Sequence, residues 1–198
     1  MAELPQRAAR PHHVWTSDVL FDRTEAGPAL KLLIVLDADT REHRAIRVER
    51  RLAAGEVIAT LELLCAQHGA PEYVRRDHGP ERIAPAWQSW LAQRGSQTVS
   101  ITPGHPWEHG DAERFIGTCR DECLNEEIFR SLEEARVVIA SWRWEDHHRR
   151  PHSSLNYRTP AERALHAGGD APSGLDSGTP NATEACQGHR LHFSLDQF

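Results

Sequence analysis

The sequence predicts an α/β domain built on a mixed sheet, and two observations lead to this fold class. Three strand-like segments come first, and the turn residues between them, among them Gly, Pro, Asp and Thr, suit antiparallel hairpins. The chain then continues as helix, strand, helix and strand before it ends in helices, without an internal repeat. A length of 198 residues is enough for one domain with a sizeable core.

Five segments combine apolar residues with flanking turn signals and are predicted as strands. They span 14–21, 29–36, 43–48, 72–76 and 97–101. The second contains the run LKLLIVL, which is denser in apolar residues than the others. Such a run is typical of a strand buried on both faces inside a sheet.

Helical periodicity predicts the remaining elements. Apolar spacing of three and four residues marks segments at 57–68, 81–93, 112–123 and 131–149. Gly69 is placed to end the first helix, and Ser131 with Glu134 forms a capping box at the start of the last. Pro160 then suits the first turn of a short final helix.

Composition bounds the class of protein. We expect a lead-in without regular structure at 1–13, a core domain at 14–166 and a mostly disordered, Gly- and Ser-rich tail at 167–198. The chain has no apolar run of roughly 20 residues and no signal-peptide segment, and its four cysteines are too scattered for a disulfide framework, so we expect a cytoplasmic protein. A net charge of −6 argues against a simple DNA-binding module, but it suits a site that gathers carboxylates around metal ions.

Three carboxylates stand out as candidate site residues. Asp18 lies inside the first predicted strand, Asp77 ends the fourth, and Glu113 lies near the start of a helix, beside its apolar stripe. Each also has a structural explanation: a solvated strand face, a turn, and a favourable helix dipole, respectively. The interval between Asp77 and Glu113 is 35 residues, which gives the three a recognisable spacing.

Seven motifs in order carry a resemblance to a known family. They are Trp15-x-x-Asp18, Asp77-x-Gly79-Pro80-Glu81, Pro103-Gly104-x-Pro106, Glu113-x-Phe115-x-Gly117, Arg120-Asp121-Glu122-Cys123-Leu124-Asn125, Arg150-Pro151-His152-Ser153-Ser154-Leu155 and Thr159-Pro160-Ala161-Glu162. Over residues 14–165 the chain resembles the retroviral-integrase-like catalytic core of insertion-sequence transposases. The resemblance implies an RNase H-like fold with a five-stranded mixed sheet flanked by helices.

The resemblance also implies the chemistry. Asp18, Asp77 and Glu113 would be the catalytic residues and would hold two Mg²⁺ or Mn²⁺ ions, because these hard cations prefer carboxylate oxygens and two of them can drive phosphodiester transfer. The expected activity is DNA cleavage and strand transfer, with the transposon ends and the target DNA as partners and a homo-oligomer formed on DNA. The residues expected to bind DNA are Arg114, Arg120, Arg149, Arg150 and His152.

Several residues near the motifs depart from the family pattern. The departures are His78, Arg82, His109, Ile116 and the pair Asp146-His147, which replaces Tyr-Asn. Residues around metal ligands orient them, so these changes bear on metal affinity and rate. No helix-turn-helix pattern is visible upstream of Asp18.

Three other functions compete with the transposase. A truncated or decayed remnant would bind nucleic acid or another subunit through its arginines, without catalysis. A nuclease of the RNase H type would share the fold, although the 35-residue interval favours the transposase. A zinc site could use Cys119, Cys123 and the pair His147-His148, but Cys119 lies in an apolar stripe and the chain has no CxxC pair.

Overall fold

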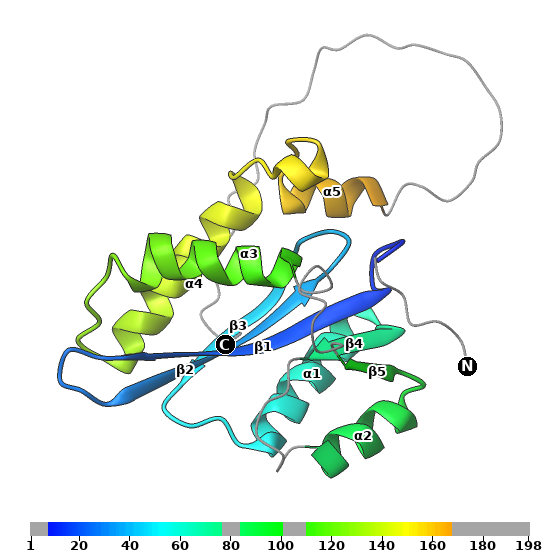
Figure 1. Ribbon diagram of the computed structural model, residues 1–198, viewed down its shortest axis with the longest axis horizontal. Coiled ribbons are helices and arrows are strands. Elements are labelled where there is room, and N and C mark those ends of the chain that lie inside the picture. The colour runs from blue at the N-terminus through cyan, green and yellow to red at the C-terminus, as the bar shows by residue number, and fades with distance from the viewer. Residues whose placement is uncertain (1–7, 77–83, 101–109, 168–198) are drawn as a thin grey trace, which may run out of the picture.

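The structure is a computed structural model that describes residues 8–76, 84–100 and 110–167 (Figure 1). Its strands are β1 Val14–Arg23, β2 Ala29–Asp37, β3 His43–Glu49, β4 Tyr73–Arg76 and β5 Gln97–Ser100. Its α-helices are α1 Ala54–His68, α2 Ala84–Gln93, α3 Gly110–Cys119, α4 Leu132–His148 and α5 Pro160–Ala167. A π-helical turn, η3 Arg120–Leu124, follows α3, and a 3-10 turn, η4 Ser153–Leu155, precedes α5.

The five strands form one mixed sheet in the order β3-β2-β1-β4-β5. β1 pairs antiparallel with β2, and β2 pairs antiparallel with β3. β4 pairs parallel with both β1 and β5, because helical crossovers return the chain to the same end of the sheet. The α/β class and the mixed five-stranded sheet are therefore confirmed.

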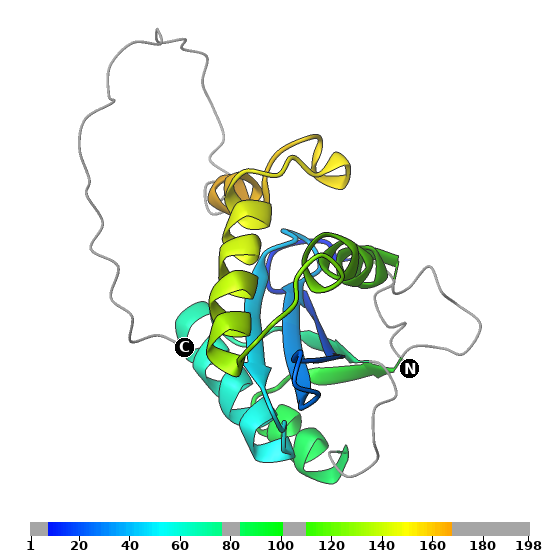
Figure 2. The same cartoon turned by 90° about the vertical axis from the view of Figure 1, so that its left-hand side faces the viewer.

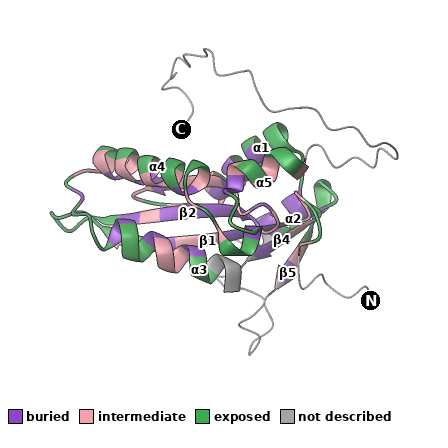
Figure 3. Cartoon of the chain, turned by 90° about the horizontal axis from the view of Figure 1, so that it is seen from above, coloured by how far each residue is buried: buried purple, intermediate pink, exposed green. Residues whose placement is uncertain are grey.

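Helices cover both faces of this sheet (Figures 1 and 2). Successive side chains of β2 alternate between the two faces. Leu32 and Ile34 pack in a core cluster with residues of α3 and α4, whereas Leu33 and Val35 pack in a second cluster with residues of α1 and α2. The strands are buried between layers whose outer faces are exposed, as Figure 3 shows. The prediction of a strand buried on both faces is confirmed for β2.

Local signals in the sequence are found where they were predicted. Gly69 follows α1 with a positive φ of 83°, and its N–H donates to the Cys65 carbonyl over 2.9 Å. Ser131 caps α4, because its hydroxyl accepts from the Glu134 N–H over 3.0 Å. The Glu134 carboxylate accepts from the N–H of Arg130 rather than from that of Ser131, so only half of the predicted capping box forms. At the start of α5, Thr159 and Glu162 do bond each other reciprocally.

The predicted helix at 112–123 differs from the structure in one respect. α3 ends at Cys119 and continues as the π-turn η3, in which the Asn125 N–H donates to the Arg120 carbonyl over 2.8 Å. A π-turn adds a residue to the turn, which allows both Cys123 and Leu124 to face the core. The apolar stripe itself continues as predicted, with Cys119 and Cys123 buried.

Parts of the predicted organisation extend beyond the described residues. Residues 168–198 of the predicted tail, 1–7 of the predicted lead-in, residues 81–83 and Ile101 lie outside them. The remaining lead-in residues contact the domain: the His12 N–H donates to Asp37 Oδ2 over 2.9 Å, and Arg10 pairs with Glu72 over 2.8 Å. Within the described part, no helix is both long and apolar enough to span a membrane.

Candidate active site

Asp18 lies in the middle of β1, opposite Ile34 of β2. Residues two apart on a strand point to the same face. Leu20 belongs to the core cluster with α3 and α4, whereas Trp15 packs in the cluster with α1 and α2. Asp18 is therefore on the face that α3 and α4 cover, and it is half-buried there. A carboxylate on a largely apolar face is costly unless charge or water compensates it, which makes Asp18 a functional candidate.

The end of β4 lies directly beside this aspartate. β4 is the parallel neighbour of β1, and its last residue, Arg76, is in register with Ser17. Asp77 is the next residue in the sequence, and it lies outside the described residues. Its place in the predicted triad is therefore an expectation.

Glu113 is exposed near the start of α3. Two residues later, the buried side chain of Phe115 anchors α3 in the core cluster that also contains Leu20 and Ile34. The structure thus brings the helix of Glu113 over the sheet face that carries Asp18. Among the described residues no group of three or more His, Cys, Asp or Glu side chains could hold a metal ion, and Asp77 is not one of these residues. The two described carboxylates have the hard oxygen donors that Mg²⁺ prefers.

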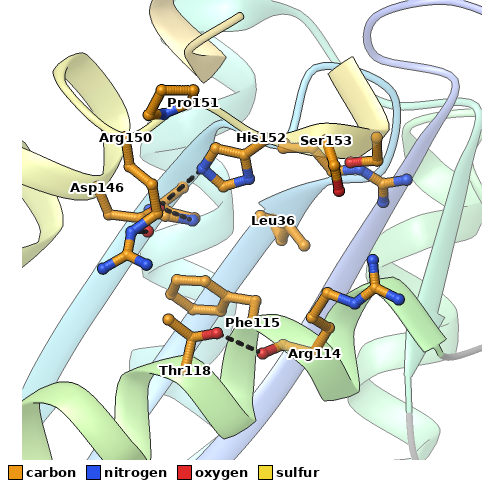
Figure 4. Close-up of a pocket in the computed structure, with 12 residues that line it drawn as sticks. Leu36, Arg114, Phe115, Thr118, Asp146, Arg150, Pro151, His152 and Ser153 are labelled. Carbon is orange, nitrogen blue, oxygen red and sulfur yellow. Dashed lines mark hydrogen bonds and ion pairs between the residues drawn. The ribbon is translucent and has the colours of Figure 1, made fainter. Parts of the chain in front are cut away.

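The same face holds a buried ionic cluster that the sequence did not predict. Asp146 of α4 is 2% exposed, and its Oδ1 lies 2.9 Å from Arg150 Nε. Its Oδ2 lies 3.4 Å from Nε2 of His43 and 3.4 Å from Nε2 of His152 (Figure 4). Arg150 also pairs through both terminal nitrogens with Glu122. This cluster ties β3, η3 and α4 to the Arg-Pro-His segment.

Burial and charge act differently on the members of this cluster. Burial lowers the pKa of His43 to about 3, and this outweighs the opposing effect of the Asp146 charge, so His43 is neutral at pH 7. Burial by itself would raise the pKa of Asp146, but the close approach of His152 and the neighbouring positive charges lower it. Asp146 is therefore ionised and held between Arg150 and two histidines. At Asp146 the sequence showed only a departure from the family pattern, because the partners of this residue come from distant parts of the chain.

A second set of ion pairs fixes α4 to the start of β3. His147 Nε2 lies 3.5 Å from Glu42 Oε1, and Glu42 in turn pairs with Arg44 over 2.6 Å. Arg143 donates to the carbonyls of His43 and Arg44 over 2.5 and 3.1 Å. Both residues that replace the family's Tyr-Asn pair therefore contact the β3 end of the sheet.

The five predicted DNA-binding residues divide into two groups. Arg114, Arg150 and His152 line one pocket of about 180 Å³, together with Arg41, Ser153 and Ser154. Arg120 and Arg149 do not line it; both are exposed, and the Arg149 guanidinium lies over the Trp144 ring, 5.0 Å from its centroid. The structure therefore brings together three of the five, whose contact with DNA is a prediction.

The cysteines of the zinc hypothesis are core residues. Cys119 is fully buried and Cys123 is 1% exposed, within the apolar cluster under α3 and α4. Burial raises the pKa of Cys119 to about 12 and that of Cys123 to about 11, which disfavours the thiolates that zinc binds. His148 stacks on Trp144 instead, with ring centroids 5.0 Å apart. These contacts explain the residues without a metal.

Comparison with solved structures defines the fold class. The integrase catalytic core domain of HTLV-2, in complex with magnesium in a trimeric form, matches with a TM-score of 0.61 at 16% identity, over 79% of this chain and 98% of that one. The simian T-cell lymphotropic virus intasome in complex with PP2A regulatory subunit B56 gamma gives 0.66 at 18% identity, over 90% of this chain and 62% of that one. The fold is that of a retroviral integrase catalytic core, which confirms the RNase H-like prediction.

Sequence comparison gives the family. Two family models described as integrase core domain match residues 8–106 and 94–160. The chain therefore belongs to the integrase core domain family, and it is homologous to transposases of insertion elements. The resemblance drawn from the motifs is confirmed.

Relatives of this chain come from bacterial insertion elements. An uncharacterized protein of insertion element IS476 from Xanthomonas euvesicatoria is 38% identical, over 79% of this chain and 45% of the relative. One from IS407 of Burkholderia multivorans is 38% identical, over 82% of this chain and 60% of the relative. The transposase InsF for insertion sequence IS3A of Escherichia coli K12 is 23% identical, over 71% of this chain and 51% of the relative. The chain thus spans about half the length of these relatives.

Proposed function

We propose that this chain provides the catalytic domain, residues 14–166, of an insertion-element transposase that cleaves DNA and joins the cut end to a target. The observation that carries the proposal is the position of Asp18. It lies on the sheet face under α3, beside the described end of β4, in a chain of the integrase core family. The parallel register places the β4 end, and the sequence places Asp77 directly after it.

In this proposal three carboxylates hold the metal. Asp18, Asp77 and Glu113 supply oxygen ligands to two Mg²⁺ or Mn²⁺ ions. When bound, the ions activate water or a 3′-hydroxyl and stabilise the leaving oxygen, so no covalent protein nucleophile is needed. The protein's own contribution is rigidity: Asp18 is held by the pairing of β1 with β2 and directly follows the part of β1 that pairs with β4, and Phe115 anchors the helix of Glu113.

The proposed partners follow from this activity. The substrates are the ends of the element and a target duplex, and the active form is a homo-oligomer assembled on DNA. The similar chain from simian T-cell lymphotropic virus is part of an intasome, which supports an assembly of this kind. The net charge of −6 means that the chain alone binds DNA weakly, through local clusters of arginine rather than a general basic field.

The test is metal-dependent nicking of supercoiled plasmid DNA. With Mg²⁺ or Mn²⁺ the wild-type chain should nick the plasmid, while Asp18→Asn, Asp77→Asn and Glu113→Gln should be inactive yet folded. Asp121→Asn is the matched control, because it removes an exposed carboxylate in the turn after α3 without touching the proposed triad. Full nicking by Asp77→Asn would overturn the assignment of the triad.

A binding measurement separates an intact metal site from a remnant. Mg²⁺ or Mn²⁺ that binds the native state should raise the melting temperature. Asp18→Asn should lose this rise and should be more stable than the wild type without metal, because it removes one charge from a group of carboxylates. A wild-type protein that neither nicks DNA nor responds to millimolar Mn²⁺ would instead support a non-catalytic remnant that binds nucleic acid.

A further inference from the structure

The pocket that contains Arg114 and His152 is small and is assembled from distant segments (Figure 4). Its lining side chains come from β2, the turn before β3, α3, the end of α4 and the Arg-Pro-His segment that begins at Arg150. Its volume of about 180 Å³ is well below the roughly 300–1,000 Å³ of sites for drug-sized ligands. It equals the liquid volume of roughly six water molecules, which is room for one small anion and its nearest waters.

The pocket has an apolar floor and a polar rim. Leu36 and Phe115 are 2% and 8% exposed and form part of its lining. The hydroxyl-bearing side chains of Thr118, Ser153 and Ser154 also line it. A site of this kind lowers the local dielectric constant around a bound charge while it supplies hydrogen-bond donors.

The charges of the lining favour an anion. Three arginines line the pocket, Arg41, Arg114 and Arg150, against one acidic residue, Asp146. Asp146 and Arg150 already pair with each other. Arg150 also forms an ion pair with Glu122, which is not among the lining residues. The charge of Asp146 is therefore balanced within the lining, and Arg114 adds a positive charge that is not paired with a described acidic residue.

Arg114 is the residue best placed to act on a ligand. Its side chain rises from α3 toward the segment that carries Ser153 (Figure 4). Within the described part of the chain it has no ion pair, and it is exposed. Its guanidinium can bind an oxyanion through two parallel N–H groups. The Arg41 turn is also specialised, because this residue has a left-handed backbone with φ of 62°, which non-glycine residues adopt infrequently.

We propose that this pocket binds one phosphate group, held by Arg114 and Arg41 and by the hydroxyls of Ser153 and Ser154. The source of the phosphate rests on the proposed function: in a transposase it is a backbone phosphate of DNA. Glu113 directly precedes Arg114, so a strand held here would be positioned relative to a proposed metal ligand. Such a contact positions DNA without reading its sequence. Arg120 and Arg149 would contribute only outside this pocket.

The first test measures DNA binding at several salt concentrations in EDTA, by fluorescence anisotropy with a labelled duplex. Arg114→Ala should weaken binding several-fold and reduce the salt slope by about 0.9, the value for one phosphate contact. Arg114→Lys should retain the slope but bind less tightly, because it loses the bidentate geometry. Arg130→Ala, which removes an exposed arginine that does not line the pocket, should leave the slope unchanged. An unchanged slope in a folded Arg114→Ala protein would rule out a DNA backbone phosphate as the ligand of this pocket.

A double-mutant cycle tests whether the two sides of the pocket hold the same phosphate. Ser153→Ala should weaken DNA binding, but not in an Arg114→Ala background, because a contact through a shared group is lost only once. The same change combined with Arg149→Ala should be additive. Additivity of Ser153→Ala with Arg114→Ala would exclude a shared phosphate. Because these measurements omit metal, a chain without nicking activity can still pass them, and a nicking-competent chain can still fail.

Inorganic phosphate distinguishes the two sources of the ligand. If the pocket also takes free phosphate, millimolar phosphate should raise the melting temperature of the wild type and of Arg130→Ala, but not that of Arg114→Ala, when each is compared with chloride at equal ionic strength. If only a DNA phosphate is bound, phosphate should have no such effect while the anisotropy results stand. Failure of both the salt-slope test and the phosphate test would leave the pocket without a ligand and would contradict the proposal.

Discussion

The two faces of the sheet are closed by different kinds of side chain. Under α1 and α2, a core cluster of apolar residues that includes Trp15, Leu33 and Leu61 seals the sheet. Under α3 and α4, a similar apolar cluster lies beside two buried polar residues, His43 and Asp146. Asp146 is charged, and His43 can titrate. Half-buried Asp18 and the pocket with Arg114 lie on this second side as well.

This difference shows where the fold accepts an energetic cost. Buried charges destabilise a protein unless partners compensate them. Even a paired buried charge often contributes no more to the free energy of unfolding than well-packed apolar residues of similar volume. On the face under α1 and α2 this cost is confined to the end of β2, where Asp37, opposite Trp15, is fully buried and pairs with Arg44 over 3.5 Å. The face under α3 and α4 carries the cost around His43 and Asp146, and this is the face to which we assign metal binding, phosphate binding and catalysis.

The largest expected effect is on stability, from a residue on the face under α1 and α2. Leu61 of α1 is fully buried, so Leu61→Ala should lower the free energy of unfolding by about 2–5 kcal/mol through lost burial and the cavity left behind. Leu63, in the same helix, is 65% exposed, and Leu63→Ala should change it by less than about 0.5 kcal/mol. Urea unfolding followed by circular dichroism measures both. Similar losses in the two variants would contradict the assigned inner face of α1.

An intermediate effect is expected from His43, on the face under α3 and α4, as a dependence of stability on pH. The pKa of His43 is about 3 in the folded state and about 6.5 when unfolded, so below pH 6.5 the unfolded chain binds a proton that the folded chain does not. The stability from neutral His43 is therefore present above pH 6.5 and is lost progressively as the pH falls toward 3. The expected slope from this one group is about 1.4 kcal/mol per pH unit between pH 6 and 4.

His43→Phe is the variant that tests this dependence. It retains a ring against Phe115, whose centroid lies 3.9 Å from that of His43, but it cannot titrate. The slope of unfolding free energy against pH should be shallower in this variant by about 1.4 kcal/mol per pH unit, the contribution of one titrating group. His12 and His68 also have pKa values lowered by burial, and they contribute equally to both proteins. Asp146, whose folded pKa is lowered, contributes stability that is lost only at still lower pH. Equal slopes in the two proteins would show that His43 is not buried as described.

The sequence predicted the elements of the fold well because its strongest signals are local. The LKLLIVL run, Gly69 and the Ser131 N-cap each reflect the requirements of a few neighbouring residues, and each is found in the structure. The spacing of Asp77 and Glu113 is likewise a linear feature of the chain. It identified the family, as the matches to the integrase core domain confirm.

The buried cluster around Asp146 could not be predicted in the same way. His43 and Asp146 are about a hundred positions apart, and only the packing of α4 against β3 brings them together. The sequence could show that Asp146 departs from the family pattern, but not that Arg150 and His152 surround it. It also treated Arg149 and Arg150 alike, whereas one lies over Trp144 and the other joins two carboxylates.

The smallest expected effect concerns the thiols and zinc. Cys119 and Cys123 lie in the apolar cluster under α3 and α4, and burial raises their pKa values to about 12 and 11. Cys65 lies in the cluster under α1 and α2 and is 8% exposed. Zinc requires deprotonated thiols, so adding Zn²⁺ or a chelator should leave the melting temperature unchanged. In a Cys186→Ser background, which removes the thiol outside the described residues, iodoacetamide at pH 8 should label Cys65 before the other two. Mass spectrometry of peptides should find Cys119 and Cys123 labelled only after urea unfolds the protein. Stoichiometric zinc binding that Cys119→Ala abolishes would instead show that these two thiols are accessible ligands, and the face under α3 and α4 would then contain a metal site distinct from the proposed triad.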